Sequence, residues 1–225
     1  MTRTFFVTGT DTEVGKTAVS CALLEAAAQR GLSTAAVKPV AAGCDPQGRN
    51  EDALQLIASM SESLDYEQVN PVALQEALAP HLAAEHEGRR LQASRLAGLC
   101  RGVMAGQAKM VLMEGAGGWR VPISPRETLS YLARELQAEV FLLVGMRLVC
   151  INHALLTAEA IGRDGLRLAG WIANQCGPRM ACHDENLDSL RHLLGAPLLG
   201  SIPHLSPFSA EVAARSIDFS LLWGT

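Results

Sequence analysis

The stretch from Arg3 to Thr17 constrains the fold more than any other, because it combines a short apolar run, a loop bounded by glycines and the start of a helix. Thr4–Thr8 is a β-rich run that Gly9 ends, and from Gly15 the composition becomes that of a helix reaching about Arg30. Bare backbone N–H groups and the positive end of a helix dipole favour an anion at such a junction. The sequence therefore predicts a phosphate-binding loop after the first strand.

The Gly-Lys-Thr sequence at 15–17 indicates which chemistry the loop supports. Lys16 would place its charge on the β- and γ-phosphates, and the Thr17 hydroxyl is of the type that ligates Mg²⁺. Five residues separate Gly9 from Gly15, whereas the strict nucleotide signature has four. An ordinary turn is the alternative, but it leaves a lysine in the first helical turn unexplained, where the dipole disfavours it.

Length and composition favour one domain with a parallel sheet. The chain has 225 residues and no Ser/Gly-rich or Pro-rich linker, so we expect a single domain over 1–225. Hydrophobic residues make up 48% of the chain but aromatic residues only 4%. The core must therefore consist of Ala, Leu, Val and Ile, as in parallel sheets covered by helices.

Charge and cysteine usage exclude several classes of protein. The formal net charge is −4 and no cluster of Lys or Arg stands out, so neither a nucleic-acid surface nor an anionic membrane is indicated. The N-terminus has no signal-peptide pattern and no apolar run approaches about 18 residues, so we expect a cytoplasmic protein. The six cysteines contain no Cys-x-x-Cys pair, which predicts free thiols rather than a zinc site.

Apolar runs and helical patterns alternate along the rest of the chain. Such alternation requires parallel strands joined by right-handed crossovers, so we predict an α/β fold with a doubly wound, mostly parallel sheet in a P-loop NTPase-like three-layer sandwich. Further strands are expected at 33–38, 109–113, 139–144, 166–173 and 197–202, helices at 51–60, 91–108, 129–137, 152–163, 184–194 and 211–222, a loop at 40–50, and a surface excursion with short helices at 61–90.

Four polar side chains, Lys38, Asp52, Glu114 and Asn174, fall just beyond predicted strands, where open α/β sheets bind their ligands. Glu114 follows the apolar run Met-Val-Leu-Met, and burying its carboxylate is costly unless a cation or hydrogen-bond donors meet it. Asp52 has a second interpretation, as a favourable charge in the first turn of a helix that Asn50 could cap.

Several segments together resemble the dethiobiotin synthetase family. They are Gly-Thr-Asp-Thr-Glu-Val-Gly-Lys-Thr at 9–17, Val-Lys-Pro-Val at 37–40, Glu-Gly-Ala-Gly-Gly-Trp at 114–119 and Cys-Ile-Asn-His-Ala at 150–154, and the likeness continues through 169–174 and 196–203. The extra loop residue is part of this family's pattern. The resemblance implies an ATP-dependent cyclo-ligase that converts 7,8-diaminononanoate, CO₂ and MgATP to dethiobiotin, ADP and phosphate, through a carbamate and a carbamic-phosphoric anhydride.

The resemblance also implies roles for individual residues. Lys16, Lys38 and Thr12 would act on the phosphate and the carbamate, and Thr17, Asp52 and Glu114 would hold Mg²⁺, an ion that prefers hard oxygen ligands. The remaining nucleotide contacts would be Glu13, Val14, Gly15, Ala18, Gly115, Ala116 and Gly117 around the phosphates, and Asn174, Gln175, Pro203, His204, Leu205 and Glu211 around the adenine, the register of Glu211 being ambiguous by about one residue.

Substrate contacts implied by the family include two departures. Ala42 stands where a serine hydroxyl is common, which removes a hydrogen bond worth about 0.5–1.5 kcal/mol. Val149 stands where the family usually has glycine, ahead of Cys150, Ile151 and Asn152, so a β-branched residue enters the substrate loop. Both departures fall on residues that the resemblance assigns to the substrate and not to ATP.

The resemblance further implies a homodimer, in which the segment 148–153 of one subunit closes the partner's substrate pocket. Leu148-Val149-Cys150-Ile151 is apolar just beyond a predicted strand end, where a monomer would expose it.

The main alternative is a switch-type P-loop ATPase of the partition or septum-site group. Those proteins typically have a second lysine inside the loop and often a basic amphipathic tail, whereas here 10–14 reads Thr-Asp-Thr-Glu-Val and the chain ends near Ile-Asp-Phe-Ser-Leu-Leu-Trp. A non-catalytic nucleotide-binding module is a third class, and we would expect it to lack one of the carboxylates or lysines.

Overall fold

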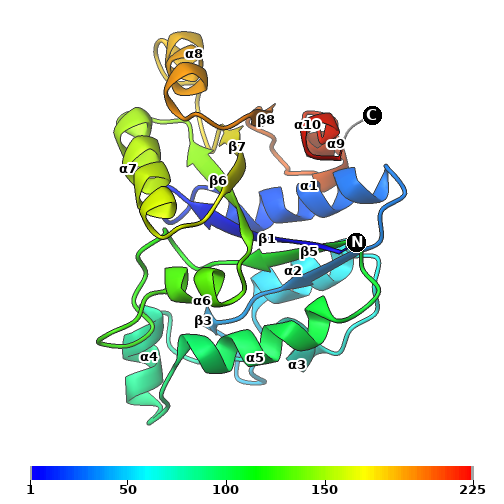
Figure 1. The fold of residues 1–225 in the computed structure, drawn as a ribbon, viewed down its shortest axis with the longest axis vertical. Helices are drawn as coiled ribbons and strands as arrows, with labels where there is room; N and C mark the ends of the chain where they lie inside the picture. The colour runs from blue at the N-terminus through cyan, green and yellow to red at the C-terminus, as the bar shows by residue number, and fades with distance from the viewer. Residues whose placement is uncertain (1, 224–225) are drawn as a thin grey trace.

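The computed structural model describes residues 2–223, and its centre is a six-stranded sheet in which all neighbouring strands are parallel (Figure 1). This confirms the predicted doubly wound α/β fold. The strands lie in the order β2-β5-β1-β6-β7-β8. Their bounds are β1 Arg3–Gly9, β2 Thr34–Val37, β5 Met110–Glu114, β6 Glu139–Gly145, β7 Leu168–Asn174 and β8 Leu198–Ile202.

Both faces of the sheet are buried. Successive residues of β1 are therefore apolar, because they point to opposite faces. Phe5 and Val7 belong to one core cluster, whereas Phe6 belongs to the cluster on the opposite face. Phe5 also stacks on Phe141 of β6, with ring centroids 4.2 Å apart. A continuous apolar strand is therefore what a sheet covered on both sides requires.

Helices form the two outer layers. The cluster around Phe5 includes residues of α1 (Lys16–Ala28), α2 (Glu51–Ser59) and α9 (Ala210–Ala214). The cluster around Phe6 includes residues of α5 (Ala93–Met104), α6 (Leu129–Glu135) and α7 (Cys150–Arg163), and α7 also packs with α8 (His183–Leu193) beside β6 and β7. These helices stand on either side of the sheet in Figure 1.

The winding of the chain reverses at β1. The chain passes from β1 through α1 to β2, and β5 later enters the sheet between β1 and β2. The next strand, β6, pairs with β1 on its other side. The loop after β1 therefore opens at the switch point, where doubly wound sheets bind their ligands.

The segment 61–90 forms short helices, as predicted, but it is more than a surface excursion. It contains α3 (Tyr66–Val69), β4 (Ala73–Leu74) and α4 (Pro80–His86), and Leu74 is fully buried. β4 pairs in parallel with β3 (Ala41–Ala42), inside the stretch predicted to be a loop. A two-residue strand is too short to produce a periodic pattern, which explains why the sequence did not reveal it.

The single helix predicted at 211–222 is wrong, because α9 ends at Ala214 and α10 covers only Ser220–Trp223. Between them the backbone N–H of Asp218 donates to the carbonyl of Leu199 at 2.7 Å, and Ile217 forms a bridge with Gly200. A Cβ at Gly200 would lie 2.3 Å from a backbone oxygen, so glycine permits this approach. Pairing with the edge strand β8 thus interrupts the helix.

Within residues 2–223, no helix is both long and apolar enough to cross a membrane.

Candidate active site

The loop between β1 and α1 has the backbone conformation that close packing at a phosphate site requires. Glu13 and Gly15 have positive φ values of 55° and 81°. A Cβ on Gly15 would lie 2.6 Å from Nδ2 of Asn174, so only glycine fits there. Val14 is fully buried, and it packs so closely on Gly9 and Gly145 that a Cβ on either would approach it within 2.6 Å and 2.8 Å.

Lys16 begins α1 with its side chain largely buried. Its Nζ donates to the backbone carbonyl of Asp11 at 3.2 Å, and no carboxylate in the described part of the chain forms an ion pair with it. Burial lowers the pKa of Lys16 below its usual value, and the positive charge of Lys38 lowers it further. The ammonium group thus lies at the cleft with its charge uncompensated by a direct partner.

Lys38 lies directly beyond β2 and is held between two carboxylates. Its Nζ lies 2.6 Å from Oε1 of Glu114 and 2.8 Å from Oδ2 of Asp52, and it also donates to the carbonyl of Gly115 at 3.4 Å. Burial alone would lower the pKa of Lys38, but Glu114 and Asp52 outweigh burial and raise it. The same contact lowers the pKa of Asp52, against the effect of its partial burial.

Glu114, the last residue of β5, is fully buried and joins Thr17 to this group. The Thr17 hydroxyl donates to Oε1 of Glu114 at 2.8 Å, while Oε2 of Glu114 is buried without a hydrogen-bond partner. A buried carboxylate oxygen with no donor is costly in a protein interior, and a cation would satisfy it. Thr17, Asp52 and Glu114 therefore offer hard oxygen ligands around one point.

The donor set fits magnesium better than a metal held entirely by protein. No group of three or more His, Cys, Asp or Glu side chains in residues 2–223 could hold a metal ion. Two carboxylates and a hydroxyl leave positions for water and for phosphate oxygens, which is how Mg²⁺ is usually bound beside a nucleotide.

One cleft of about 450 Å³ brings most of the predicted phosphate-side and substrate-side residues together. Ala42 of β3 lines it with a methyl group, where the dethiobiotin synthetase family commonly has a serine hydroxyl. Leu78, just before α4, and Pro80, the first residue of α4, also line it. The predicted residues on its wall are Thr12, Glu13, Gly15, Lys16, Thr17, Ala18, Lys38, Ala42, Asp52, Ala116 and Gly117.

The residues predicted around adenine lie at neighbouring strand ends and do not line this cleft. Asn174 ends β7 and donates from Nδ2 to the carbonyl of Val14 at 2.9 Å, while the N–H of Gln175 donates to the carbonyl of Ile202 at 3.0 Å. Pro203, His204 and Leu205 follow β8 directly. Glu211 lies on α9 in an exposed ion pair with Arg215, at 3.0 Å, so the structure does not place its carboxylate in the cleft.

The segment predicted to contact the diamine also stands apart from the cleft. Leu148 is 84% exposed and Val149 is 51% exposed. Cys150, Ile151 and Asn152 form the first turn of α7. Val149 has a φ of 75°, a left-handed conformation that is unfavourable for a β-branched residue and natural for glycine. The departure at this position therefore carries backbone strain.

Some supporting residues were not found from the sequence. The Asn70 side chain donates to the carbonyl of Lys38 at 2.7 Å, and the N–H of Lys38 donates to the carbonyl of Val69 at 2.7 Å. The Tyr66 hydroxyl accepts from the N–H of Asn50 at 2.7 Å. The first two bonds fix the backbone at Lys38, and the third fixes Asn50, which caps α2. The sequence around Asn70 shows only an Asn-Pro pair at 70–71, which does not indicate this support.

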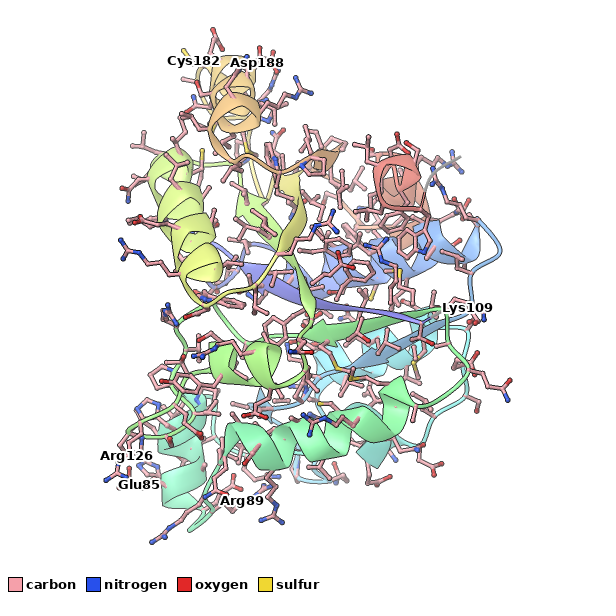
Figure 2. The ribbon with its side chains drawn as sticks, viewed as in Figure 1. Glu85, Arg89, Lys109, Arg126, Cys182 and Asp188 are labelled. Atoms are coloured by element: carbon pink, nitrogen blue, oxygen red, sulfur yellow. The ribbon has the colours of Figure 1, made fainter. Side chains whose placement is uncertain are left out.

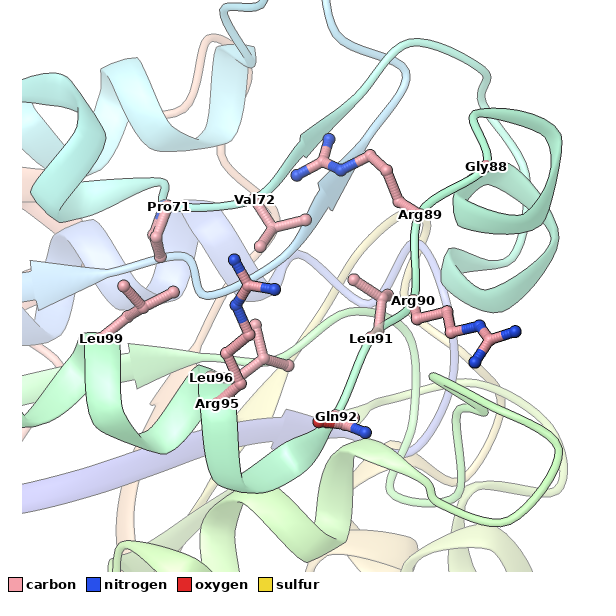
Figure 3. A pocket seen from close by; sticks show the side chains of 10 residues that line it. All are labelled: Pro71, Val72, Gly88, Arg89, Arg90, Leu91, Gln92, Arg95, Leu96 and Leu99. Carbon is pink, nitrogen blue, oxygen red and sulfur yellow. The ribbon is translucent and has the colours of Figure 1, made fainter.

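A second cleft of about 470 Å³ lies beside α5 and shares no lining residue with the first (Figure 3). Arg89, Arg90 and Arg95 line it together with Leu96 and Leu99. Arg89 and Arg126 lie with Glu85 at the end of the molecule that α4 occupies (Figure 2). Arg89 already donates to the carbonyl of Ala73 at 2.6 Å. The lining of this cleft includes no carboxylate, whereas Asp52 lines the first cleft beside Lys38.

Comparisons with known proteins find relatives that match nearly the whole chain. A family model described as an AAA domain matches residues 3–212. An ATP-dependent dethiobiotin synthetase of Cellvibrio japonicus is 55% identical over 223 residues, covering 98% of this chain and 97% of the relative. Proteins of the same name from Pseudomonas aeruginosa and Marinobacter nauticus are 56% and 52% identical, covering 95% and 90% of this chain and 95% and 88% of the relatives.

Solved structures resemble the fold at low sequence identity. The MinD cell division protein of Aquifex aeolicus has a TM-score of 0.58 at 15% identity and covers 98% of this chain and 89% of its own. A ParA family ATPase of Chlorobium tepidum has a TM-score of 0.57 at 12% identity and covers 100% of this chain and 93% of its own. These likenesses establish a P-loop NTPase fold and nothing more specific.

Proposed function

The chain belongs to the ATP-dependent dethiobiotin synthetase family, and from that membership we propose that its phosphate-loop cleft closes the cyclic urea of dethiobiotin. The reaction is a step of biotin biosynthesis that consumes 7,8-diaminononanoate, CO₂ and ATP and yields dethiobiotin, ADP and phosphate. The observation that carries the proposal is that Lys16 and Lys38 reach one cleft, beside two carboxylates and a phosphate loop.

The chemistry proceeds through anionic intermediates. One amine of the diamine adds to CO₂ and loses a proton, which gives a carbamate. A carbamate oxygen attacks the γ-phosphorus of ATP, ADP leaves, and a carbamic-phosphoric anhydride forms. The second amine attacks the carbonyl carbon and loses a proton as the bond to phosphate breaks. Such a sequence depends on positioning and on compensation of negative charge.

Lys16 contacts the transferring phosphate in this proposal, while Lys38 contacts both the carbamate and the γ-phosphate. Thr12 faces the carbamate. All three line the cleft, and the burial of Lys38 between Asp52 and Glu114 supports its role because it holds the ammonium group in a fixed place.

Thr17, Asp52 and Glu114 would hold Mg²⁺, and the partnerless Oε2 of Glu114 supports this assignment. When bound, the ion neutralises charge on the β- and γ-phosphates. The protein's own contribution is the fixed placement of the three oxygen ligands, through the hydrogen bond from Thr17 to Glu114 and the ion pairs to Lys38.

The remaining nucleotide contacts follow the strand ends. Backbone groups of 13–18 and 115–117 surround the phosphates, which the cleft lining supports. Asn174 and Gln175, with 203–205, surround the adenine, because they extend from the neighbouring ends of β7 and β8. Glu211 has the weakest support, since its carboxylate pairs with Arg215.

The diamine site requires a second copy of the chain. Val149, Cys150, Ile151 and Asn152 contact the diamine in the proposed homodimer, where they close the pocket of the partner subunit. The strong exposure of Leu148 beside them supports an interface at this place. Ala42 lines the cleft near Lys38 and contacts the same substrate without a hydroxyl. The six-stranded sheet runs through the chain from β1 to β8, which supports one catalytic domain.

The experiment that tests the proposed function is phosphate release from MgATP in bicarbonate buffer, with and without 7,8-diaminononanoate. We expect release only with the diamine, accompanied by one dethiobiotin for each phosphate, measured by mass spectrometry. Phosphate release at the same rate without the diamine would instead favour a switch-type ATPase, the class of the ParA and MinD neighbours that share the fold.

A further inference from the structure

The segment that precedes α7 is attached to the phosphate loop by an ion pair between Asp11 and Arg147. We infer that these two residues are a positioning pair, which aligns the diamine-facing segment 148–152 with the phosphate loop of the same subunit. The inference rests on the proposed function, in which the segment 148–153, which includes these residues, closes the partner's pocket. The pair would then join the ATP site of one subunit to the diamine site of the other.

The Asp11 carboxylate bridges two parts of the chain. Its Oδ2 accepts a hydrogen bond from Nη2 of Arg147, and its Oδ1 accepts from the backbone N–H of Thr12 at 2.8 Å. The backbone carbonyl of the same residue accepts from Nζ of Lys16 at 3.2 Å. These two bonds hold Asp11 in the phosphate loop, so its carboxylate is a fixed anchor for Arg147.

Arg147 is the partner of Asp11 in the segment that precedes α7. It lies between β6 and α7, and its carbonyl accepts from the N–H of Cys150 at 3.0 Å, which closes the turn that begins the helix. The N–H of Met146 donates to the carbonyl of Asn174 at 2.9 Å. The backbone of this turn is thus fixed on its β6 side, and the arginine side chain supplies a link to the phosphate loop.

Backbone contacts between the loop and β6 lie beside the ion pair. The N–H of Thr10 donates to the carbonyl of Leu143 at 2.9 Å, and the N–H of Gly145 donates to the Thr10 hydroxyl at 3.4 Å. These bonds end at Gly145, before the exposed residues Leu148 and Val149. The ion pair is therefore the contact that reaches from the phosphate loop toward the diamine-facing turn.

The charges around the pair keep it ionised near neutral pH. The N–H of Thr12 lowers the pKa of Asp11, and Arg147 and His153 lower it further. Both side chains of the pair are about half exposed, at 44% and 48%. Because exposed ion pairs contribute little to folding stability, removal of this one should leave the fold intact and affect mainly the geometry of the turn.

The test is steady-state kinetics of diamine-dependent phosphate release for Arg147→Met, Asp11→Asn and the double variant. We expect KM for the diamine to rise about tenfold, below the roughly 100-fold that a misplacement of about 1 Å can cause. The Kd for MgATP without diamine and the kcat should stay near the wild-type values. The double variant should have a KM for the diamine no higher than that of either single variant, because each single variant already removes the same interaction.

Two controls separate positioning from general surface charge. Arg163→Met removes an exposed ion pair with Glu159 at the far end of α7 and should leave KM unchanged. Arg147→Lys keeps the charge and should restore most of the diamine affinity. Raising the ionic strength should raise KM of the wild type toward that of Arg147→Met, since exposed pairs are screened by salt.

The outcomes distinguish this inference from the function on which it rests. A wild type that releases no phosphate in response to the diamine contradicts the proposed function. A wild type that does so, with Arg147→Met and Arg147→Lys both matching its KM, overturns the positioning pair. Additive losses in the double variant, or an equal loss in Arg163→Met, would overturn it as well.

Discussion

Lys16 and Lys38 line the same cleft, yet the protein surrounds their ammonium groups in opposite ways. Lys38 is buried between Asp52 and Glu114, at 2.8 Å and 2.6 Å. Lys16 donates to one backbone carbonyl, at 3.2 Å. Their pKa values shift accordingly, because the carboxylates raise that of Lys38 and burial lowers that of Lys16. The third lysine of the chain, Lys109, is exposed and belongs to neither arrangement.

The difference separates a charge that the fold has compensated from one that a ligand must compensate. The charge of Lys38 is part of a buried network, so its loss would remove the cation that pairs with the fully buried Glu114. The charge of Lys16 is destabilising until an anion binds, which makes it suited to a nucleotide phosphate. Substitutions at the two lysines should therefore affect the stability of the ligand-free protein in different ways.

Lys38→Met should lower the free energy of unfolding by about 3–5 kcal/mol, because one partner of a buried ion pair is removed. Urea denaturation of the ligand-free protein measures this. Adding Glu114→Gln in the same chain should recover part of the loss, since the uncompensated charge is then gone. Lys109→Met is the matched control and should change stability little. An unchanged stability in Lys38→Met would contradict the account of the network.

Lys38→Met should also reduce kcat by about 10²–10³-fold, the usual cost of losing one preorganised donor to a developing anion. The Kd for MgATP, measured by calorimetry, should change much less than kcat, because Lys16 and the loop still hold the phosphates. A variant that loses nucleotide affinity in proportion to kcat would show that the two lysines do the same work.

Lys16→Met should weaken MgATP binding by about 1.5–3 kcal/mol, the value of a hydrogen bond to a charged group, or roughly 10- to 150-fold in Kd. Its ligand-free stability should equal or exceed that of the wild type, since a buried ammonium without a carboxylate partner is replaced by an apolar side chain. Calorimetry and urea denaturation on the same sample test both parts. Reduced stability would mean that Lys16 is compensated after all.

The smallest effect concerns pH. Because the folded-state pKa of Lys16 is lowered, the unfolded chain binds more protons below the unperturbed value near 10.5, and stability gains a contribution as pH rises toward it. Burial raises the pKa of Cys100 to about 12, which opposes this gain above pH 9 in every variant. The difference in free energy of unfolding between wild type and Lys16→Met isolates the contribution of the lysine. This difference should narrow from pH 7 to 10.

Lys38 should behave in the opposite sense within the same titration. Its raised pKa means that its contribution is fully present below about 10.5 and is lost only as pH rises through the folded-state value. The difference in free energy of unfolding between wild type and Lys38→Met should therefore stay constant over pH 7–10. A narrowing difference for both lysines would remove the contrast between them.

The sequence predicted the parts of the site that follow from strand ends and motif spacing. Lys16, Lys38, Thr17 and Glu114 could be placed together because the carboxyl ends of parallel strands meet at one edge of the sheet. The helix dipole explained Asp52 equally well, and only the 2.8 Å contact with Lys38 distinguishes the two interpretations.

Contacts between distant segments without a local pattern could not be predicted. Asn70 supports Lys38 across 32 positions of sequence, and Arg147 reaches Asp11 across 136. The break between α9 and α10 depends on the approach of residues 216–218 to Gly200, which no helical periodicity reveals. The left-handed backbone at Val149 contradicts the preference of its own side chain, so only its surroundings can impose it.

The most direct test of the central claim is a crystal structure with Mg²⁺ and a non-hydrolysable ATP analogue. Nζ of Lys16 and Nζ of Lys38 should both lie within hydrogen-bond distance, about 2.7–3.2 Å, of the terminal phosphate. Thr17, Asp52 and Glu114 should surround one ion beside it. A terminal phosphate beyond the reach of Lys38, with that ammonium still enclosed by its two carboxylates, would contradict the account.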